Sequence, residues 1–141
     1  MFGPDGTPID PAPFIDEKRL YTLDKYTLGY QDQIPFVNKM LEESIRTLIA
    51  ESATPPVILL QTDTAPLFTN GSDQFKILNA YYMPGHTDQL YPTISPVNTF
   101  RAVFNSYFGT HYPLLDDVSY KSPIPYIYDF TKIPNEPCGR Q

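Results

Sequence analysis

Residues 54–66, TPPVILLQTDTAP, decide the fold that this sequence predicts. The two prolines end whatever element precedes them, because proline lacks the amide hydrogen that a helix or a central strand needs. The apolar run at residues 57–61 is typical of a strand buried on both faces, as in a parallel sheet. Such strands belong to α/β folds, so we expect an α/β domain.

Asp63 directly follows this strand, between Thr62 and Thr64. In open α/β sheets, ligands bind just beyond the carboxyl ends of the strands, which makes Asp63 the first candidate for chemistry. Asp and Thr also hydrogen-bond to nearby backbone in turns, and the pattern alone favours that simpler role. Both roles stay open at this point.

Two amphipathic helices are predicted. Residues 31–52 repeat apolar side chains at spacings of three and four, with Asp32 as the N-cap and Pro35 in the first turn. Residues 95–109 predict the second helix, which begins after Ser95 and ends before Gly109. We expect Arg101 and Asn105 to be solvated. The apolar stripe of this helix is typical of core packing and consists of Val97, Phe100, Val103, Phe104, Tyr107 and Phe108.

The remaining elements are short. Residues 76–83 predict a second strand, and residues 126–130 a short edge strand. Residues 15–29 are compatible with a short helix or turn that ends at Gly29.

The 16 prolines concentrate at the two ends of the chain. Residues 1–14 predict an extended arm, docked by Phe2, Ile9 and Phe14, because proline excludes helices and central strands. We therefore expect three parts: this arm, an α/β domain at residues 15–120, and a proline-rich tail at residues 121–141.

Composition excludes several classes of function. The 141 residues fit one domain, and the net charge of −6 without a Lys/Arg cluster excludes nucleic-acid binding. The single cysteine, Cys138, predicts neither an internal disulfide nor a zinc site. No run approaches the roughly 18 apolar residues of a membrane span, and the N-terminus lacks the pattern of a signal peptide.

Motifs for catalysis are sparse. The sequence has no Gly-rich phosphate loop and no nucleophile elbow. His86 and His111 lie in predicted loops without partner motifs, which favours ordinary surface histidines. Asp116 and Asp117 form an acidic pair whose simplest interpretation is a solvated turn.

Several strings nevertheless resemble a known family. PPVILLQTDTAP, KILNAYYMPG, LYPTISPVNTFRAVFNSYFG and LLDDVSY, in this order, resemble the C-terminal part of the sulfatase-like hydrolase/transferase family of the alkaline-phosphatase superfamily. The resemblance extends over nearly the whole chain. It implies a doubly wound α/β domain with a divalent metal at the sheet edge, where a nucleophile attacks a sulfate or phosphate ester. It also implies an extracytoplasmic, membrane-associated parent protein.

The metal site of that family is degenerate in this sequence. Asp63 matches a metal-binding aspartate, but Thr64 replaces a metal-binding histidine and Ala65 replaces a glycine. A hydroxyl is a poor substitute for imidazole on a transition metal. The nucleophile has no counterpart here, so we assign no catalytic residue, and Asp63 is the one expected metal ligand.

Three explanations follow from this comparison: a fragment of an enzyme, one piece of a split enzyme, or a degenerate remnant. All three predict that one side of the sheet is unpaired in the isolated chain, which would promote association. The expected partner is the N-terminal half of the same domain or another protein chain, and the chain on its own should be catalytically silent. The alternative is a non-catalytic structural or interaction subunit of a larger assembly.

Overall fold

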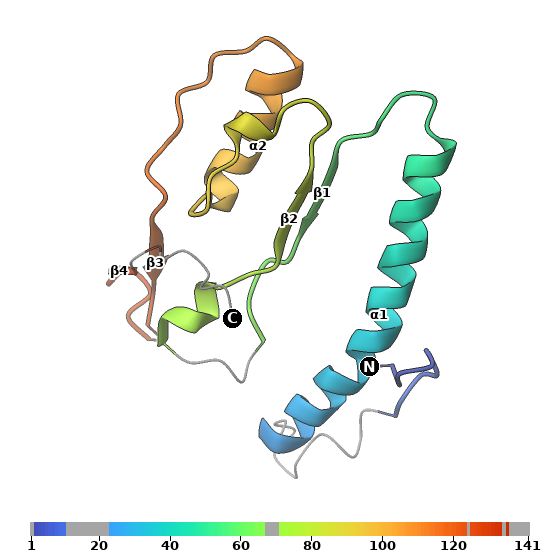
Figure 1. The fold of residues 1–141 in the computed structure, drawn as a ribbon. Helices are drawn as coiled ribbons and strands as arrows, with labels where there is room; N and C mark the ends of the chain where they lie inside the picture. Colours follow the sequence, from blue (N-terminus) through green and yellow to red (C-terminus); the bar gives the residue numbers. More distant parts are fainter. Residues whose placement is uncertain (1, 11–22, 67–70, 124, 134, 136–141) are drawn as a thin grey trace. The chain divides into compact units, whose positions relative to one another are not determined.

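The computed structural model describes residues 2–10, 23–66, 71–123, 125–133 and 135 (Figure 1). The chain divides into two compact units, Met1–Pro56 with Ala65–Gln74 and Val57–Thr64 with Phe75–Gln141. The described residues form two α-helices and two small antiparallel sheets, so the prediction of a mixed α/β chain is confirmed. The expected boundaries at residues 14 and 120 stay predictions.

The first unit is dominated by α1, Leu23–Glu51, which is longer than predicted. It begins well before Asp32 and passes through Gly29, so the predicted break at Gly29 is wrong. Pro35 lies inside the helix rather than in its first turn. An interior proline removes one backbone hydrogen bond and crowds the carbonyl four residues before it, at a cost of about 3 kcal/mol. The helix-forming residues that follow Pro35 in α1 favour the helix against this cost. The predicted end near Ser52 is confirmed.

The N-terminal arm folds back as a tight loop beside α1. Phe2 and Pro8 form an isolated antiparallel bridge, and Asp5 Oδ1 accepts the Thr7 amide at 2.9 Å. The Phe2 and Phe36 rings lie 5.5 Å apart between centroids. The predicted docking by Phe2 is therefore confirmed, whereas Phe14 lies outside the described residues.

The second unit contains the strand that follows the two prolines. β1, Ile58–Gln61, pairs antiparallel with β2, Asn79–Tyr82, in a register that sets Leu59 opposite Tyr81 (Figure 1). Three of the four β1 residues are half-buried and Gln61 is exposed, so the prediction of a strand buried on both faces is wrong for the described residues. No further strand of the described chain covers β1, because this sheet has two strands. Helical turns η2, Gly71–Phe75, and η3, Thr87–Gln89, lie in the connections around β2.

The second helix, α2, Pro96–Tyr107, begins and ends where the sequence predicted, but its buried face differs. The buried residues are small or polar: Asn98, Thr99, Ala102 and Val103. Phe100 and Phe108 are 58% and 69% exposed, and Val97 and Phe104 are exposed as well, so the predicted core stripe is wrong at these four positions. Val103 is buried and Tyr107 is half-buried. We call the exposed side chains the aromatic ridge: Phe100, Phe104, Phe108 and Tyr112.

Polar bonding explains the inversion of α2. A buried amide must keep its hydrogen-bond partners, and the partners of Asn98 lie in the segment after the helix. Asn105, expected in solvent, is half-buried and accepts the Tyr112 amide at 2.8 Å. Arg101 is also half-buried, and its guanidinium donates to the Val97 carbonyl at 2.7 Å.

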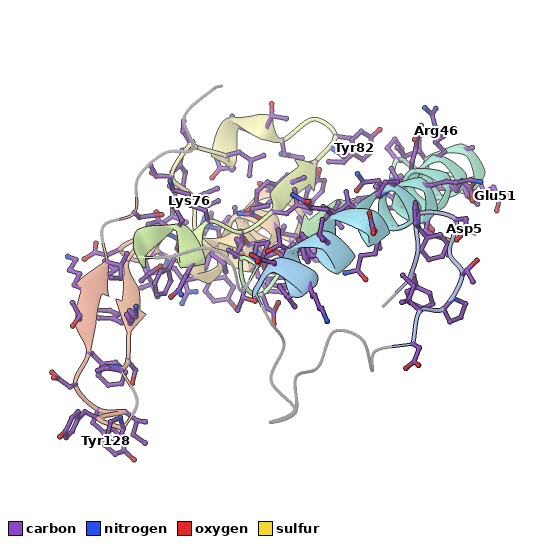
Figure 2. The ribbon with its side chains drawn as sticks, turned by 90° about the horizontal axis from the view of Figure 1, so that it is seen from below. Asp5, Arg46, Glu51, Lys76, Tyr82 and Tyr128 are labelled. Atoms are coloured by element: carbon purple, nitrogen blue, oxygen red, sulfur yellow. The ribbon has the colours of Figure 1, made fainter. Side chains whose placement is uncertain are left out.

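The C-terminal segment forms a hairpin of β3, Ser119–Lys121, and β4, Thr131–Ile133. The predicted edge strand at residues 126–130 is wrong: these residues form the exposed connection between the two strands, with Tyr128 at its tip (Figure 2). Pro123 and Pro125 each lack the amide hydrogen that a strand pair needs. The paired residues therefore lie on either side of this segment, at 119–121 and 131–133. Cys138 lies outside the described residues.

Gly6 offers a test of how the arm docks. Its φ is +86°, and a Cβ there would overlap the Phe36 ring. We expect Gly6→Ala to displace that ring and release the arm, measured as loss of NMR contacts between Phe2 and Phe36. Gly85→Ala is the control, since Gly85 also has a positive φ of +79° but no atom within 4 Å. An alanine with positive φ costs about 1 kcal/mol in both variants, so only the overlap with Phe36 distinguishes them. Contacts between Phe2 and Phe36 that persist in Gly6→Ala would contradict the docking geometry.

Candidate functional site

The strongest polar site is built around the Asp117 carboxylate. Its Oδ2 accepts the Tyr91 hydroxyl at 2.6 Å, and its Oδ1 accepts the Ser95 amide at 2.8 Å. The Ser95 hydroxyl and the Asn98 amide also donate to Oδ1. We call Tyr91, Ser95, Asn98 and Asp117 the Asp117 network. These bonds join the start of α2 to the segment that follows it.

Asn98 completes the network from inside. The residue is fully buried, with an exposed fraction of 0%. Its amide nitrogen donates to the Tyr91 hydroxyl and to the Leu115 carbonyl, both at 2.8 Å, and its oxygen accepts the Leu115 amide at 2.9 Å. An amide with both ends satisfied is tolerated in a protein interior, whereas an unpaired one is costly.

The start of α2 uses Ser95 in an unexpected way. Ser95 occupies the predicted N-cap position, with extended backbone, but its side chain makes no bond to the helix amides. The hydroxyl donates to Asp117 instead, and the Ser95 amide donates to the same oxygen. The carboxylate thereby fixes the residue from which α2 begins.

The network changes the acidity of two groups. Desolvation raises the pKa of Asp117, but hydrogen bonds from Ser95, Tyr91 and Asn98 together hold it below the ordinary value of 3.8. Desolvation, and then the hydrogen bond to Asp117, raise the pKa of Tyr91 from 10.0 to about 12. At neutral pH, Asp117 is therefore ionised and Tyr91 is a neutral donor.

A cavity of about 490 Å³ lies beside the network and is lined in part by Tyr91 and Ser95. Its other walls come from β2 and the residues before it, from the segment that leads into α2, from β3 and from a residue after β4. They are formed by Phe75, Ile77, Asn79, Tyr81, Leu90, Pro92, Ile94, Pro96, Ser119 and Asn135. Pockets of this size hold small ligands.

Asp63 does not belong to this site. Its side chain is exposed, and its Oδ1 accepts the amide of the neighbouring Thr64 at 2.9 Å. This is a local bond between neighbouring residues in a bend, in line with the simpler role that the pattern alone favoured. In the described part of the chain, no three His, Cys, Asp or Glu side chains group closely enough to hold a metal ion. The assignment of Asp63 as a metal ligand stays a prediction.

Neither histidine takes part in the hydrogen bonds of the Asp117 network. His86 packs edge-on against Tyr107 with 4.6 Å between ring centroids, and His111 is exposed. Of the acidic pair, Asp116 is exposed as expected, whereas the prediction of a solvated turn is wrong for Asp117.

Sequence reasoning missed the Asp117 network. A signal was present, since Asn98 and Ala102 are four residues apart on one helix face and neither suits a purely apolar stripe. The stronger aromatic spacing obscured it.

No helix within the described ranges combines the length and the apolar character needed to cross a bilayer. Comparison of the chain with protein-family models, with curated proteins and with solved structures finds no match.

Asp117→Asn tests the network. The amide keeps the size of the side chain but removes the charge and presents N–H groups to donors, so we expect a loss of about 2–3 kcal/mol in the free energy of unfolding. Asp116→Asn is the matched control, and it should stay within about 0.5 kcal/mol because its side chain is exposed. Urea unfolding of the three proteins measures both. Equal stabilities would contradict the role assigned to Asp117.

The same bonds predict a dependence of stability on pH. Since the folded pKa of Asp117 is lowered, its contribution is present above pH 3.8 and is lost as the pH falls below that value. Since the pKa of Tyr91 is raised, its contribution is present below pH 10.0 and is lost as the pH rises to about 12. The stability of the wild type should approach that of Asp117→Asn as the pH falls below 3.8. As the pH rises from 10.0 to about 12, the wild type should lose stability relative to Tyr91→Phe. Parallel curves from thermal unfolding would be the contrary result.

Proposed function

We propose that this chain is a C-terminal portion of a sulfatase-like sulfate or phosphate ester hydrolase or transferase domain, and that it is catalytically silent by itself. The proposal is carried by the single acid after β1. Asp63 occupies the position of a metal ligand in the resemblance, yet its carboxylate is exposed and accepts the amide of the next residue, Thr64. One carboxylate without further ligands cannot hold a catalytic ion.

The composition of β1 also supports this proposal. β1 consists of Ile58, Leu59, Leu60 and Gln61, and such an apolar strand suits the interior of a sheet. Among the described residues its one neighbour is β2. In the proposed domain, β1 is an interior strand of a doubly wound sheet, and the N-terminal half of the domain or another chain supplies the missing strands. That other part also supplies the nucleophile and the remaining metal ligands.

A second candidate is a non-catalytic interaction subunit. The observation that favours it is the aromatic ridge, whose rings lie 5.7–6.2 Å apart from one another on the exposed side of α2. Aromatic side chains are enriched where proteins bind each other. The two candidates differ in the surface that a partner covers. In the fragment it is the β1–β2 sheet, and in the interaction subunit it is the aromatic ridge.

Metal analysis and an ester assay test catalytic silence. We expect the purified chain to bind Ca²⁺, Mg²⁺, Mn²⁺ and Zn²⁺ below stoichiometric amounts and to leave aryl sulfates and aryl phosphates intact. Asp63→Asn should change neither result, because one exposed ligand adds little affinity. A bound metal in stoichiometric amount with turnover that Asp63→Asn abolishes would overturn the proposal.

Sedimentation of two charge variants distinguishes the covered surfaces. Tyr82 on β2 and Phe104 on α2 are each 40% exposed, which makes them a matched pair. An uncovered apolar sheet promotes association, so we expect the isolated chain to self-associate and Tyr82→Glu to reduce it more than Phe104→Glu. The reverse order would favour the interaction subunit. Thermal unfolding of both variants controls for loss of the fold.

A further inference from the structure

The described walls of the cavity beside the Asp117 network are uncharged. None of its described lining residues is Lys, Arg, His, Asp or Glu. The nearest ion of the network, Asp117, is negative and lies behind Tyr91 and Ser95, whose hydroxyl groups both donate to it. An anionic ligand would meet no cation here and would be repelled by that carboxylate. The ligand that suits this cavity is neutral.

Polar groups of the wall still lack partners among the described residues. The Asn79 side-chain oxygen accepts from Gln61 at 3.1 Å, which leaves its amide N–H groups free to donate. Asn135 donates to the Thr93 carbonyl at 2.6 Å, which leaves its oxygen free to accept. The Ser119 hydroxyl, which can donate and accept, lines the same cavity. The wall thus offers donors and acceptors together.

Aromatic rings form the rest of the recognition surface. Phe75, Tyr81 and Tyr91 line the cavity. Tyr81 is held by a 2.8 Å hydrogen bond between its hydroxyl and that of buried Thr99, and Tyr91 is held by the Asp117 network. Two of the rings are therefore fixed before any ligand arrives, which lowers the entropic cost of binding.

We propose that this cavity binds a neutral polyhydroxylated ligand, with a pyranose sugar as the chemical class. A pyranose has an apolar C–H face for the rings, and each hydroxyl can donate to Asn135 and accept from Asn79. A polyproline segment also packs on tyrosine, but it offers carbonyl acceptors without N–H donors and would leave the Asn135 oxygen unpaired. The mixture of donors and acceptors therefore selects the polyol.

This inference does not depend on the proposed function. It uses the cavity alone, and neither Asp63 nor a completed sheet enters it. A chain without ester-cleaving ancestry could bind the sugar, and a chain with that ancestry could fail to bind it.

Saturation-transfer NMR of the full chain tests the site with methyl α-D-glucopyranoside and maltose as probes. For a ligand of roughly a dozen heavy atoms we expect a Kd of about 1 mM. Sodium sulfate and a capped tetraproline peptide are the competing probes, and neither should displace the sugar. Binding of tetraproline without binding of either sugar would overturn the proposal, and so would the absence of sugar binding up to about 50 mM.

Variants then locate the binding. Asn79→Ala should weaken the sugar at least about tenfold, because it removes the free donors, and Ser119→Ala should weaken it several-fold. Asn38→Ala, at an exposed position of α1, is a matched control that should leave Kd unchanged. Tyr128→Ala at the hairpin tip is a second control with the same expectation (Figure 2). Circular dichroism checks that each variant is folded. Sugar binding that survives both Asn79→Ala and Ser119→Ala would place the ligand elsewhere and contradict the proposal.

Discussion

The hydrogen bonds to the Asp117 carboxylate are the constraint on which the second unit depends. A carboxylate that leaves water loses hydration, and only several donors together can offset that loss. Asp117 obtains four, from Tyr91, from the amide and hydroxyl of Ser95, and from Asn98. Since Asp117 and Ser95 are 22 residues apart, these bonds fix where α2 begins and how the chain returns beside it.

This constraint also decides which side of α2 faces inward. Asn98 must reach Asp117, Tyr91 and the Leu115 backbone, and it can do so only from the inner face. Thr99 shares that face and bonds to Tyr81 of β2. The aromatic ridge then lies outside, although its apolar area favours burial. A polar network can win this competition because an unpaired buried amide costs about as much as burying an aromatic ring gains.

Local rules predicted the elements better than their burial. The limits of α2 followed from Pro96 and Gly109, whose φ of +64° matches the expected left-handed end of the helix. The start of α1 could not be predicted, because Gly29 and Pro35 both disfavour a helix interior by local rules, whereas the helix passes through both. Strand pairing depends on partners far along the chain. The sequence of residues 57–61 therefore could not predict that β1 pairs antiparallel with β2.

The candidate site was harder to predict than the fold, for a physical reason. Asp63 stood out because it follows an apolar run, whereas Asp117 stands next to another acid in a segment that reads as a turn. The difference between them lies in their donors: Asp63 accepts its neighbour's amide, and Asp117 accepts groups 19 to 26 residues away. Only the folded chain brings such donors together.

The network and the neutral cavity are two sides of one arrangement. Because four donors converge on Asp117, its charge is satisfied from within the protein. Tyr91 and Ser95, which supply three of these donors, turn their remaining surface to the cavity. The carboxylate therefore positions an aromatic wall without exposing a charge to the ligand. A weaker network would free the Tyr91 ring, and the cavity would lose its preorganised wall before the fold itself was lost.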